Sequence, residues 1–304
     1  MNNNPTLFQR LADTPNLILI VPPLLWAGNA VLARGVVGDG VVPPVALAFF
    51  RWTLAFLIIL PFSWGHARRD WPIARQKIPI LITLGILGIG LFNTLLYIAA
   101  ETTTSINLAV LQTLLPALVI LFTLAIFREG INGIQGFGVT LSIAGAILII
   151  SSGNIMSFLG NGMVLGDGLM LFAVVLYALY SVLLRFRPDI HALSLLVYIF
   201  AVGSLFLLPI YLWEWAARGG FSLSPTVLLS FAYVSLGPSI AAYLCWNRGV
   251  ALAGPNRAGL FINLVPVFAA VLAVLFLGER LAWYHPVGML MVFIGMVLFN
   301  RERA

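Results

Sequence analysis

One cation of this chain lies deep within an apolar segment. Arg51 comes eight residues after Pro43, where the apolar run of residues 43–63 begins. At a rise of about 1.5 Å per helical residue, it would lie ~12 Å inside that segment, near the middle of a bilayer core about 30 Å thick. An ionised group at that depth is costly unless it faces a cavity or a partner. Two interpretations stay open: an arginine paired with backbone carbonyls or reaching the membrane surface, or an anion clamp for a substrate carboxylate.

Uncharged polar and aromatic residues accompany Arg51 in the other apolar segments. An amide in lipid should face protein or water, because exposure to hydrocarbon costs its hydrogen bonds. Asn93 and Tyr97 are one helical turn apart, and Trp26 and Asn29 nearly so. Such stripes suit a cavity that offers aromatic faces and amide hydrogen bonds to a small neutral or zwitterionic solute. The predicted substrate-binding residues are Trp26, Asn29, Arg51, Asn93, Tyr97, Gln112, Tyr177, Tyr180, Tyr243, Asn247 and Asn263.

The residues that enzymes and metal sites need are dispersed along the chain. His66, His191 and His285 lie in or beside loops, and none pairs with another His, Cys or acid at ligand spacing. The sequence contains no G-x-S-x-G motif and no glycine-rich loop followed by Lys-Ser/Thr. The ten acids lie almost all at the ends of apolar runs. We therefore predict no enzyme activity, no metal site and no cofactor.

The composition requires that lipid be the solvent of this chain. Of its 304 residues, 61% are hydrophobic and 9% charged, whereas a soluble domain carries roughly 25% charged residues. The mean hydropathy is +1.05. A membrane-spanning helix needs about 20 mostly apolar residues, and ten such runs occur, near 16–34, 43–63, 78–99, 105–127, 133–152, 165–185, 192–213, 225–246, 254–277 and 283–300. Because these runs are continuously apolar rather than alternating, they predict helices and not barrel strands.

Membrane topology explains the net charge of +6 better than nucleic-acid binding does. Cytoplasmic segments of membrane proteins are enriched in Lys and Arg. With the N-terminus inside, eleven Lys and Arg residues fall on the cytoplasmic side, and only Arg34, Arg218 and Arg280 fall outside. We predict a multi-pass protein of a bacterial-type plasma (inner) membrane with both termini cytoplasmic. Trp246 and Tyr198, near span ends, are predicted to be anchors at the membrane interface.

The chain also contains an internal repeat. Residues 101–150 and 251–300 align at an offset of 150, so that Pro116 matches Pro266, and each proline is followed by a glutamate and two glycines seven residues apart. Because each repeat has an odd number of spans, successive repeats must be inverted in the membrane. The predicted fold is an all-α integral membrane protein with ten transmembrane helices in two inverted five-helix repeats around a central cavity. Its predicted divisions are a cytoplasmic tail (1–15), the first repeat (16–152), a linker (153–164), the second repeat (165–300) and a cytoplasmic tail (301–304).

Two of the predicted spans contain a central proline. A proline frees the carbonyl four residues earlier, which is that of Gln112 for Pro116 and that of Ile262 for Pro266. Each break is either a static kink repaired by a neighbouring group or a hinge in a helix that faces the substrate path. The symmetric placement of the two prolines favours the hinge. The glycine pairs of spans 5 and 10 predict closely packed helices, because small residues let backbones approach in lipid.

The repeated segments resemble a known family. The runs LQTLLPALVILFTLAIFREG and NLVPVFAAVLAVLFLGER, each followed by its glycine pair, are similar to the two EamA modules of the drug/metabolite transporter superfamily. WAGNAVLARG followed by PPVALAFFRW resembles the opening helix pair of that module, with Arg51 at the arginine of helix 2. The chain as a whole looks most like the YddG-type exporters of aromatic amino acids. The resemblance implies ten helices, a central cavity lined mainly by helices 1–4 and 6–9, and export from the cytoplasm.

We predict a secondary, non-ATP transporter that exports small metabolites by alternating access, with helices flexing near Pro116 and Pro266. Aromatic or other hydrophobic amino acids are the first substrate class. Another small-metabolite or multidrug exporter of the same superfamily is the alternative, and a membrane channel or sensor is a weaker one. The predicted partners are a small-molecule substrate and the lipid bilayer, without nucleic acid, and a monomer is compatible with this function.

Overall fold

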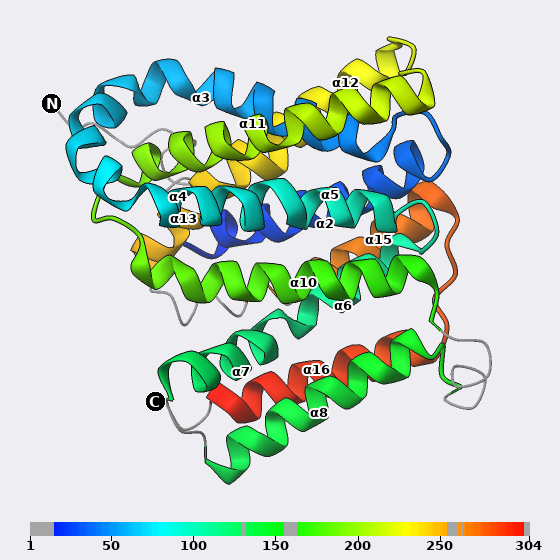
Figure 1. Ribbon diagram of the computed structural model, residues 1–304. Coiled ribbons are helices and arrows are strands. Elements are labelled where there is room, and N and C mark those ends of the chain that lie inside the picture. Colours follow the sequence, from blue (N-terminus) through cyan, green and yellow to red (C-terminus); the bar gives the residue numbers. More distant parts are fainter. Residues whose placement is uncertain (1–14, 129–131, 155–162, 254–260, 263, 301–304) are drawn as a thin grey trace, which may run out of the picture.

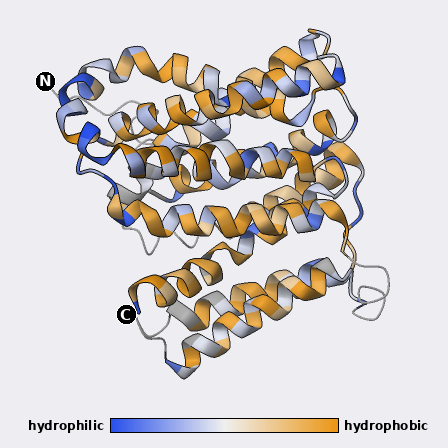
Figure 2. Cartoon of the chain, viewed as in Figure 1, coloured by the Kyte–Doolittle hydropathy of each residue, from blue (hydrophilic) through white to orange (hydrophobic). Residues whose placement is uncertain are grey.

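The computed structural model describes residues 15–128, 132–154, 163–253, 261–262 and 264–300. This part of the chain folds into helices and contains no strand. The helices are α2 (Pro15–Val37), α3 (Pro44–Ala74), α4 (Ile78–Leu84), α5 (Phe92–Ala99), α6 (Ser105–Leu111), α7 (Leu115–Phe127), α8 (Gly133–Ile150), α10 (Leu165–Leu183), α11 (Ala192–Arg218), α12 (Pro225–Val234), α13 (Ala242–Ala253), α15 (Leu264–Leu277) and α16 (Tyr284–Asn300). Figure 2 shows hydrophobic residues along the helices and hydrophilic residues mainly near their ends. The all-α membrane fold predicted from the sequence is confirmed.

Several helices join end to end into single crossings of the bundle. Helices α4 and α5 are linked by the π-helical segment Gly85–Leu91, α12 and α13 by the π-helical segment Ser235–Ala241, and α6 and α7 by the 3₁₀ turn Gln112–Leu114. Six helical segments are long and apolar enough to span a membrane, and shorter apolar helices cover Gly136–Ile149, Leu264–Leu277 and Tyr284–Gly295. One of the six, Pro44–Ala99, contains two crossings, α3 and the joined α4 and α5, so the described helices make ten crossings, as predicted. Helix α10 is the fifth crossing after α2. Because five is odd, these two helices begin at opposite ends of the bundle (Figure 1).

We name the two ends of the bundle by residues that lie there. At the Glu214 end, on the right in Figure 1, α2, α5 and α11 end and α3, α6 and α10 begin. At the Lys77 end, on the left, the ammonium of Lys77 donates to the carbonyls of Phe186 (3.1 Å) and Arg187 (3.4 Å). The functional site described below lies between these two ends.

The two repeats share local distortions of the helix as well as sequence. The π-helical segments Gly85–Leu91 and Ser235–Ala241 are each seven residues long, and they lie at the repeat offset of 150. The carbonyls freed by the two prolines are also satisfied in the same way: Leu115 N donates to Gln112 O, and Val265 N donates to Ile262 O at 3.0 Å. Short π-helical segments inside α-helices are frequent at functional sites. Here they bracket the centre of the bundle in both repeats.

Glycines bring the last helices of the two repeats together. A Cβ atom added to Gly145 of α8 would lie 2.7 Å from the carbonyl oxygen of Gly288 in α16. A Cβ on Gly295 would likewise meet the carbonyl oxygen of Gly138. The two backbones are therefore in direct contact, as the glycine spacing predicts. Figure 1 shows α8 and α16 side by side below the other helices.

The remaining contacts between the repeats follow their pseudo-symmetry. The second helices of the repeats, α3 and α11, pack against each other. The first helix of repeat one, α2, packs on α13 and α15, while the first helix of repeat two, α10, packs on α5 and α7. Each opening helix thus contacts the third and fourth crossings of the other repeat. This arrangement places both opening helices beside the central cavity.

The orientation in the membrane can be tested with reporter fusions. Fusions after residues 70, 187 and 304 should report a cytoplasmic location, and a fusion near residue 218 should report an external one, because eleven cations against three favour the Lys77 end as cytoplasmic. Alkaline phosphatase and green fluorescent protein fusions, which are active on opposite sides, provide the measurement. A cytoplasmic signal at residue 218 would contradict this orientation.

The contact between α8 and α16 predicts a position-specific effect of alanine. Gly145→Ala should lower the free energy of unfolding by about 1–3 kcal/mol, since its Cβ would force two backbones apart. Gly133→Ala, in the same helix, is the matched control, because no atom lies within 4 Å of its added Cβ. Denaturation of the purified variants in detergent measures the difference. Equal effects of the two substitutions would show that the glycine contact is not a source of stability.

Candidate functional site

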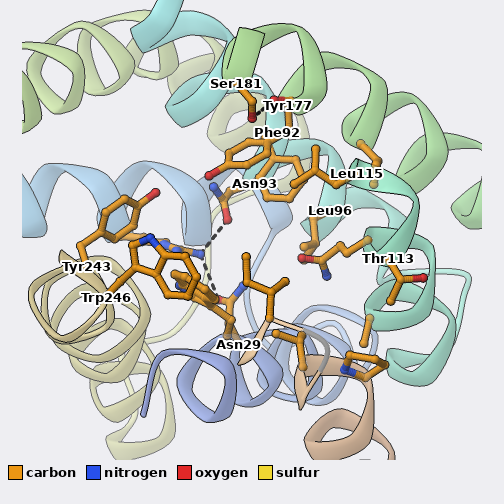
Figure 3. A pocket seen from close by; sticks show the side chains of 18 residues that line it. Asn29, Phe92, Asn93, Leu96, Thr113, Leu115, Tyr177, Ser181, Tyr243 and Trp246 are labelled. Atoms are coloured by element: carbon orange, nitrogen blue, oxygen red, sulfur yellow. Dashed lines mark hydrogen bonds between the residues drawn. The ribbon is translucent and has the colours of Figure 1, made fainter. Parts of the chain in front are cut away.

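A cavity of about 310 Å³ lies in the middle of the bundle. This volume is at the small end of the range of about 300–1,000 Å³ for sites that bind small molecules. Both repeats contribute to the wall, which consists of Trp26, Asn29, Arg51, Phe92, Asn93, Leu96, Ala109, Gln112, Thr113, Leu115, Val174, Tyr177, Ser181, Tyr243, Trp246, Ile262, Val265 and Pro266. Figure 3 shows Asn29 and Asn93 facing the cavity together with Tyr243 and Trp246.

Arg51 is held at the cavity wall entirely by neutral side chains. Its Nε donates to Ser239 Oγ at 2.7 Å. Its Nη1 donates to Asn29 Oδ1 at 3.0 Å and to Asn93 Oδ1 at 2.8 Å. Tyr97 OH also accepts from Nη1, at 2.8 Å, and itself donates to Asn29 Oδ1 at 2.7 Å. The residue as a whole is only 3% exposed, and in the described part of the chain no carboxylate bonds to its guanidinium.

The second nitrogen of the guanidinium, Nη2, has a different environment. No hydrogen bond joins it to any described residue, and it is not among the fully buried atoms that lack a partner. Arg51 belongs to the cavity wall, and the two N–H groups of Nη2 have no protein acceptor among the described residues. Four acceptors therefore share the three N–H groups of Nε and Nη1, and Nη2 is the nitrogen left without a protein acceptor in the described part of the chain.

The position of Ser239 follows from the proline that precedes it. Pro238 has no N–H, so the carbonyl of Val234, four residues earlier, lacks its usual α-helical partner. The Ser239 hydroxyl donates to this carbonyl at 2.8 Å. Its oxygen is then left to accept from Arg51, whose Nε can only donate. The carbonyl of Pro238 also accepts from Trp26 Nε1 at 3.2 Å, so the π-helical segment of repeat two binds two cavity residues of repeat one.

Aromatic rings form the other walls of the cavity. The ring of Trp26 contacts those of Tyr243 and Trp246, with centroids 6.3 and 5.8 Å apart. Phe92 and Tyr177 lie against each other, with ring centroids 4.4 Å apart, and Tyr177 and Tyr243 both belong to the cavity wall. Trp246 was predicted to be an interface anchor, and this prediction is wrong. Its place near a span end is the same whether the ring points outward or inward, so sequence position could not decide between them.

The structure brings most of the predicted site residues together. Those in the cavity wall are Trp26, Asn29, Arg51, Asn93, Gln112, Tyr177 and Tyr243, together with Pro266 of the predicted hinge pair. Tyr97 lies behind Arg51 as its hydrogen-bond partner rather than in the wall. Tyr180 is also outside the wall and packs on Gly88, where an added Cβ would meet its ring at 2.6 Å. Asn263 and the side chains of Asn247 and Pro116 lie outside the described residues.

Other residues of the site carried no signal in the sequence. The apolar wall residues Phe92, Leu96, Ala109, Leu115, Val174, Ile262 and Val265 look like any other residues of a membrane span. Thr113 and Ser181 bond to backbone carbonyls of their own helices, those of Val110 and Tyr177. Ser239 could have been found from Pro238, because a proline in mid-span marks a freed carbonyl.

Carboxylates of the second repeat tie the Glu214 end to the first repeat. Glu214 accepts from the backbone N–H groups of Val45 (3.0 Å) and Ala46 (2.7 Å) at the start of α3. Glu279 accepts from those of Ser105 (2.8 Å) and Ile106 (3.2 Å) at the start of α6. The first N–H groups of a helix have no partner within the helix, and its dipole favours an anion there. These two carboxylates therefore cap helices of the opposite repeat.

A third carboxylate, Asp167 of α10, extends this contact. It accepts from the hydroxyl of Thr103 and from Asn107 Nδ2 at 3.2 Å. His285 of α16 lies on the other side of Asn107, with Nε2 3.3 Å from Asn107 Oδ1. His285 Nδ1 accepts from the N–H of Ala282, so the neutral ring carries its proton on Nε2 and donates to the amide. Among the described residues, no group of three His, Cys, Asp or Glu side chains could hold a metal ion.

Comparisons with known proteins agree with this architecture. The model of the EamA-like transporter family matches residues 14–151 and again 164–301. An uncharacterized transporter of Archaeoglobus fulgidus is 27% identical over 295 residues, which cover 95% of this chain and 98% of the relative. An uncharacterized inner membrane transporter of Salmonella typhimurium, YicL, is 23% identical over 94% of this chain and 95% of its own.

One relative has a named substrate, and one solved structure shows the same fold. A probable terminal-alkyne amino-acid exporter of Streptantibioticus cattleyicolor is 25% identical over 93% of this chain and 92% of its own. A protein crystal structure aligns with a TM-score of 0.60 at 18% identity, over 94% of this chain and 96% of that one. Two complete matches to one family model, in two helical repeats that surround a common cavity, lead to one conclusion: this chain belongs to the EamA-like transporter family.

Proposed function

We propose that this protein is a secondary exporter of small aromatic or hydrophobic carboxylates, amino acids included, across a bacterial-type plasma membrane. The observation that carries this proposal is the state of Arg51. Hydrogen bonds to four neutral groups hold the cation in the cavity wall, while Nη2 has no protein acceptor among the described residues. A cation that served only structure would be expected to use all its donors within the protein, because each unmet donor in a buried site is costly.

The shape of the cavity supports an aromatic or hydrophobic body for the substrate. Five aromatic rings, those of Trp26, Phe92, Tyr177, Tyr243 and Trp246, belong to the wall. Aromatic rings favour each other in edge-to-face or offset arrangements, and a ligand ring can join such a cluster. A ligand with a carboxylate at Arg51 and a ring among these side chains would use both features. The named amino-acid exporter among the relatives is consistent with this substrate class.

Alternating access is the transport mechanism that the repeats favour. In transporters built from inverted repeats, the two halves rock around a site near the membrane midplane. In this protein the two repeats meet at the cavity, and the helix caps by Glu214 and Glu279 would have to separate when the Glu214 end opens. The 3₁₀ turn before Pro116 and the hydrogen bond from Val265 N to Ile262 O before Pro266 mark the points at which the crossing helices would flex.

The first test of this function is the substitution Arg51→Gln. It should weaken competition by a free carboxylic acid such as phenylalanine about 10- to 100-fold, the value of a hydrogen bond to a charged group. Competition by phenylalanine amide, which lacks the carboxylate, should not weaken. Arg51→Lys should restore part of the difference, because lysine keeps the charge but cannot reach Ser239, Asn29 and Asn93 together. The measurement is inhibition of labelled phenylalanine counterflow in proteoliposomes.

Arg218→Gln is the matched control for this experiment. Arg218 pairs with Glu101 at the Glu214 end, with half of its side chain exposed, so its loss should leave the ratio of acid to amide unchanged. If Arg51→Gln reduces competition by the acid and by the amide to the same degree, Arg51 does not bind the carboxylate.

The second test concerns the two prolines. Pro116→Ala and Pro266→Ala should each reduce the transport rate several-fold more than the yield of folded protein, because an added backbone hydrogen bond stiffens the crossing helix. Pro209→Ala in α11 is the control, since this residue is exposed on the surface of a continuous helix. Parallel losses of rate and yield would assign the two prolines a purely structural role.

A further inference from the structure

The donors and acceptors around Arg51 are arranged unevenly. A guanidinium has no acceptor, so the amide oxygens of Asn29 and Asn93 must be the atoms that face it. Both asparagines belong to the cavity wall, and their Nδ2 groups have no hydrogen-bond acceptor among the described residues. Arg51 Nη2 and these two amide nitrogens therefore present only N–H groups at this pole. Such a pole binds an anion and repels a cation.

The charge of this pole has no counter-ion in the cavity. Of the acids in the described residues, Glu214, Glu279 and Asp167 are bound at the Glu214 end. Glu101 pairs with Arg218 there, and Asp70 accepts from His191 N (2.9 Å) at the Lys77 end. Asp39 and Asp189 lie between helices and are not in the cavity wall. The segment 254–263, which precedes α15, contains no Asp or Glu.

An ammonium group would find only neutral partners in this cavity. Gln112 donates its Nε2 to Leu108 O (3.0 Å), which leaves Oε1 as an acceptor. Thr113 and Ser181 have donated their hydroxyl protons to backbone carbonyls, so their oxygens can also accept. These groups suit a neutral N–H or hydroxyl. They cannot compensate the free energy of removing an ammonium group from water as a carboxylate would. A cation–π contact with the tryptophans would offset only part of this desolvation cost.

From this charge balance we infer that the cavity prefers aromatic monoanions to zwitterions: carboxylates whose amino group is acylated or missing, such as N-acyl amino acids and arylalkanoic acids. This inference rests on the proposed function and narrows its substrate class. A monoanion neutralises the cation of Arg51 and leaves no unmatched charge in the cavity. A zwitterionic amino acid satisfies the same donors but adds a cation that no acid meets. The neutral acceptors at Gln112, Thr113 and Ser181 then serve the amide N–H of an acylated substrate.

The inference can be tested by binding to the purified full-length protein in detergent. Binding is preferable to uptake here because the uncharged forms of aromatic acids leak through bilayers. The ligands are N-acetylphenylalanine, 3-phenylpropionate, phenylalanine, phenylalanine amide and phenethylamine, compared by isothermal titration calorimetry near neutral pH. We expect the two monoanions to bind about 10-fold or more tighter than phenylalanine, as for one unmatched charged group, and the two cations to bind weakest.

A variant that adds a negative charge to the cavity wall tests the preference for monoanions independently. Gln112→Glu places a carboxylate in the cavity wall, so it should lower the affinity for N-acetylphenylalanine and raise that for phenylalanine. Gln76→Glu is the matched control, because Gln76 is exposed at the Lys77 end. Thr113→Glu serves in its place if Gln112→Glu does not fold, as judged by thermal unfolding.

The possible outcomes separate this inference from the proposed function. Phenylalanine binding as tightly as N-acetylphenylalanine in the wild-type protein would overturn the preference for monoanions and leave carboxylate transport intact. An unchanged preference in the Gln112→Glu protein would overturn the argument from cavity charge. Failure of all three carboxylates to bind would instead overturn the proposed function, and the inference with it.

Discussion

The structure depends on the need to solvate one cation in the middle of a bilayer. An unpaired arginine at this depth is costly, and no carboxylate of the described residues bonds to it. Neutral acceptors do so instead: Asn29 from α2, Asn93 and Tyr97 from α5, and Ser239 from the π-helical segment before α13. Three crossings must therefore converge on α3 at one level of the bundle. The ring of Trp52, 4.5 Å from the guanidinium carbon, supports the cation further.

The two repeats share the same helix distortions but contribute different kinds of side chain to the cavity wall. At the repeat offset of 150, Asn93 corresponds to Tyr243 and Arg51 to Ala201. At the offset of 151 that relates the opening helices, Trp26 corresponds to Tyr177. Repeat one thus supplies the cation and the amides, and repeat two supplies three of the five aromatic rings in the wall, those of Tyr177, Tyr243 and Trp246. The π-helical segments are shared by both repeats, whereas the side chains make the site asymmetric.

Three acids of the second repeat lie at the Glu214 end of the bundle, where two of them cap the starts of helices. Glu214, Glu279 and Asp167 all belong to the second repeat, and all bind the first repeat at one end of the bundle. An N-terminal helix end is one of the few places near a membrane where a carboxylate is stabilised without a cation. The same placement keeps negative charge out of the cavity. The caps at the Glu214 end and the absence of described acids from the cavity wall therefore have a common origin.

The sequence by itself determined the features that depend on composition and periodicity. Ten apolar runs determined the helical membrane fold, because apolar side chains are more stable in lipid than in water. The repeat around Pro116 and Pro266 determined the two-repeat architecture, and the odd number of spans in each repeat implies that the second is inverted. The depth of Arg51 also follows from counting residues along a helix. Asn29, Asn93 and Gln112 were identified because an amide within a span must face protein or water to keep its hydrogen bonds.

Only the tertiary structure decided which residues meet. Ser239 reaches Arg51 because Pro238 frees a carbonyl and a π-helical segment turns the hydroxyl inward, over 188 positions of sequence. Trp246 faces the cavity, while Tyr180 packs on Gly88. The rotation of a helix about its axis is set by its neighbours, and in a span that is apolar all around the sequence carries no pattern that records it. The same reason left the orientation of the asparagine oxygens, and with it the charge preference of the cavity, to the folded structure.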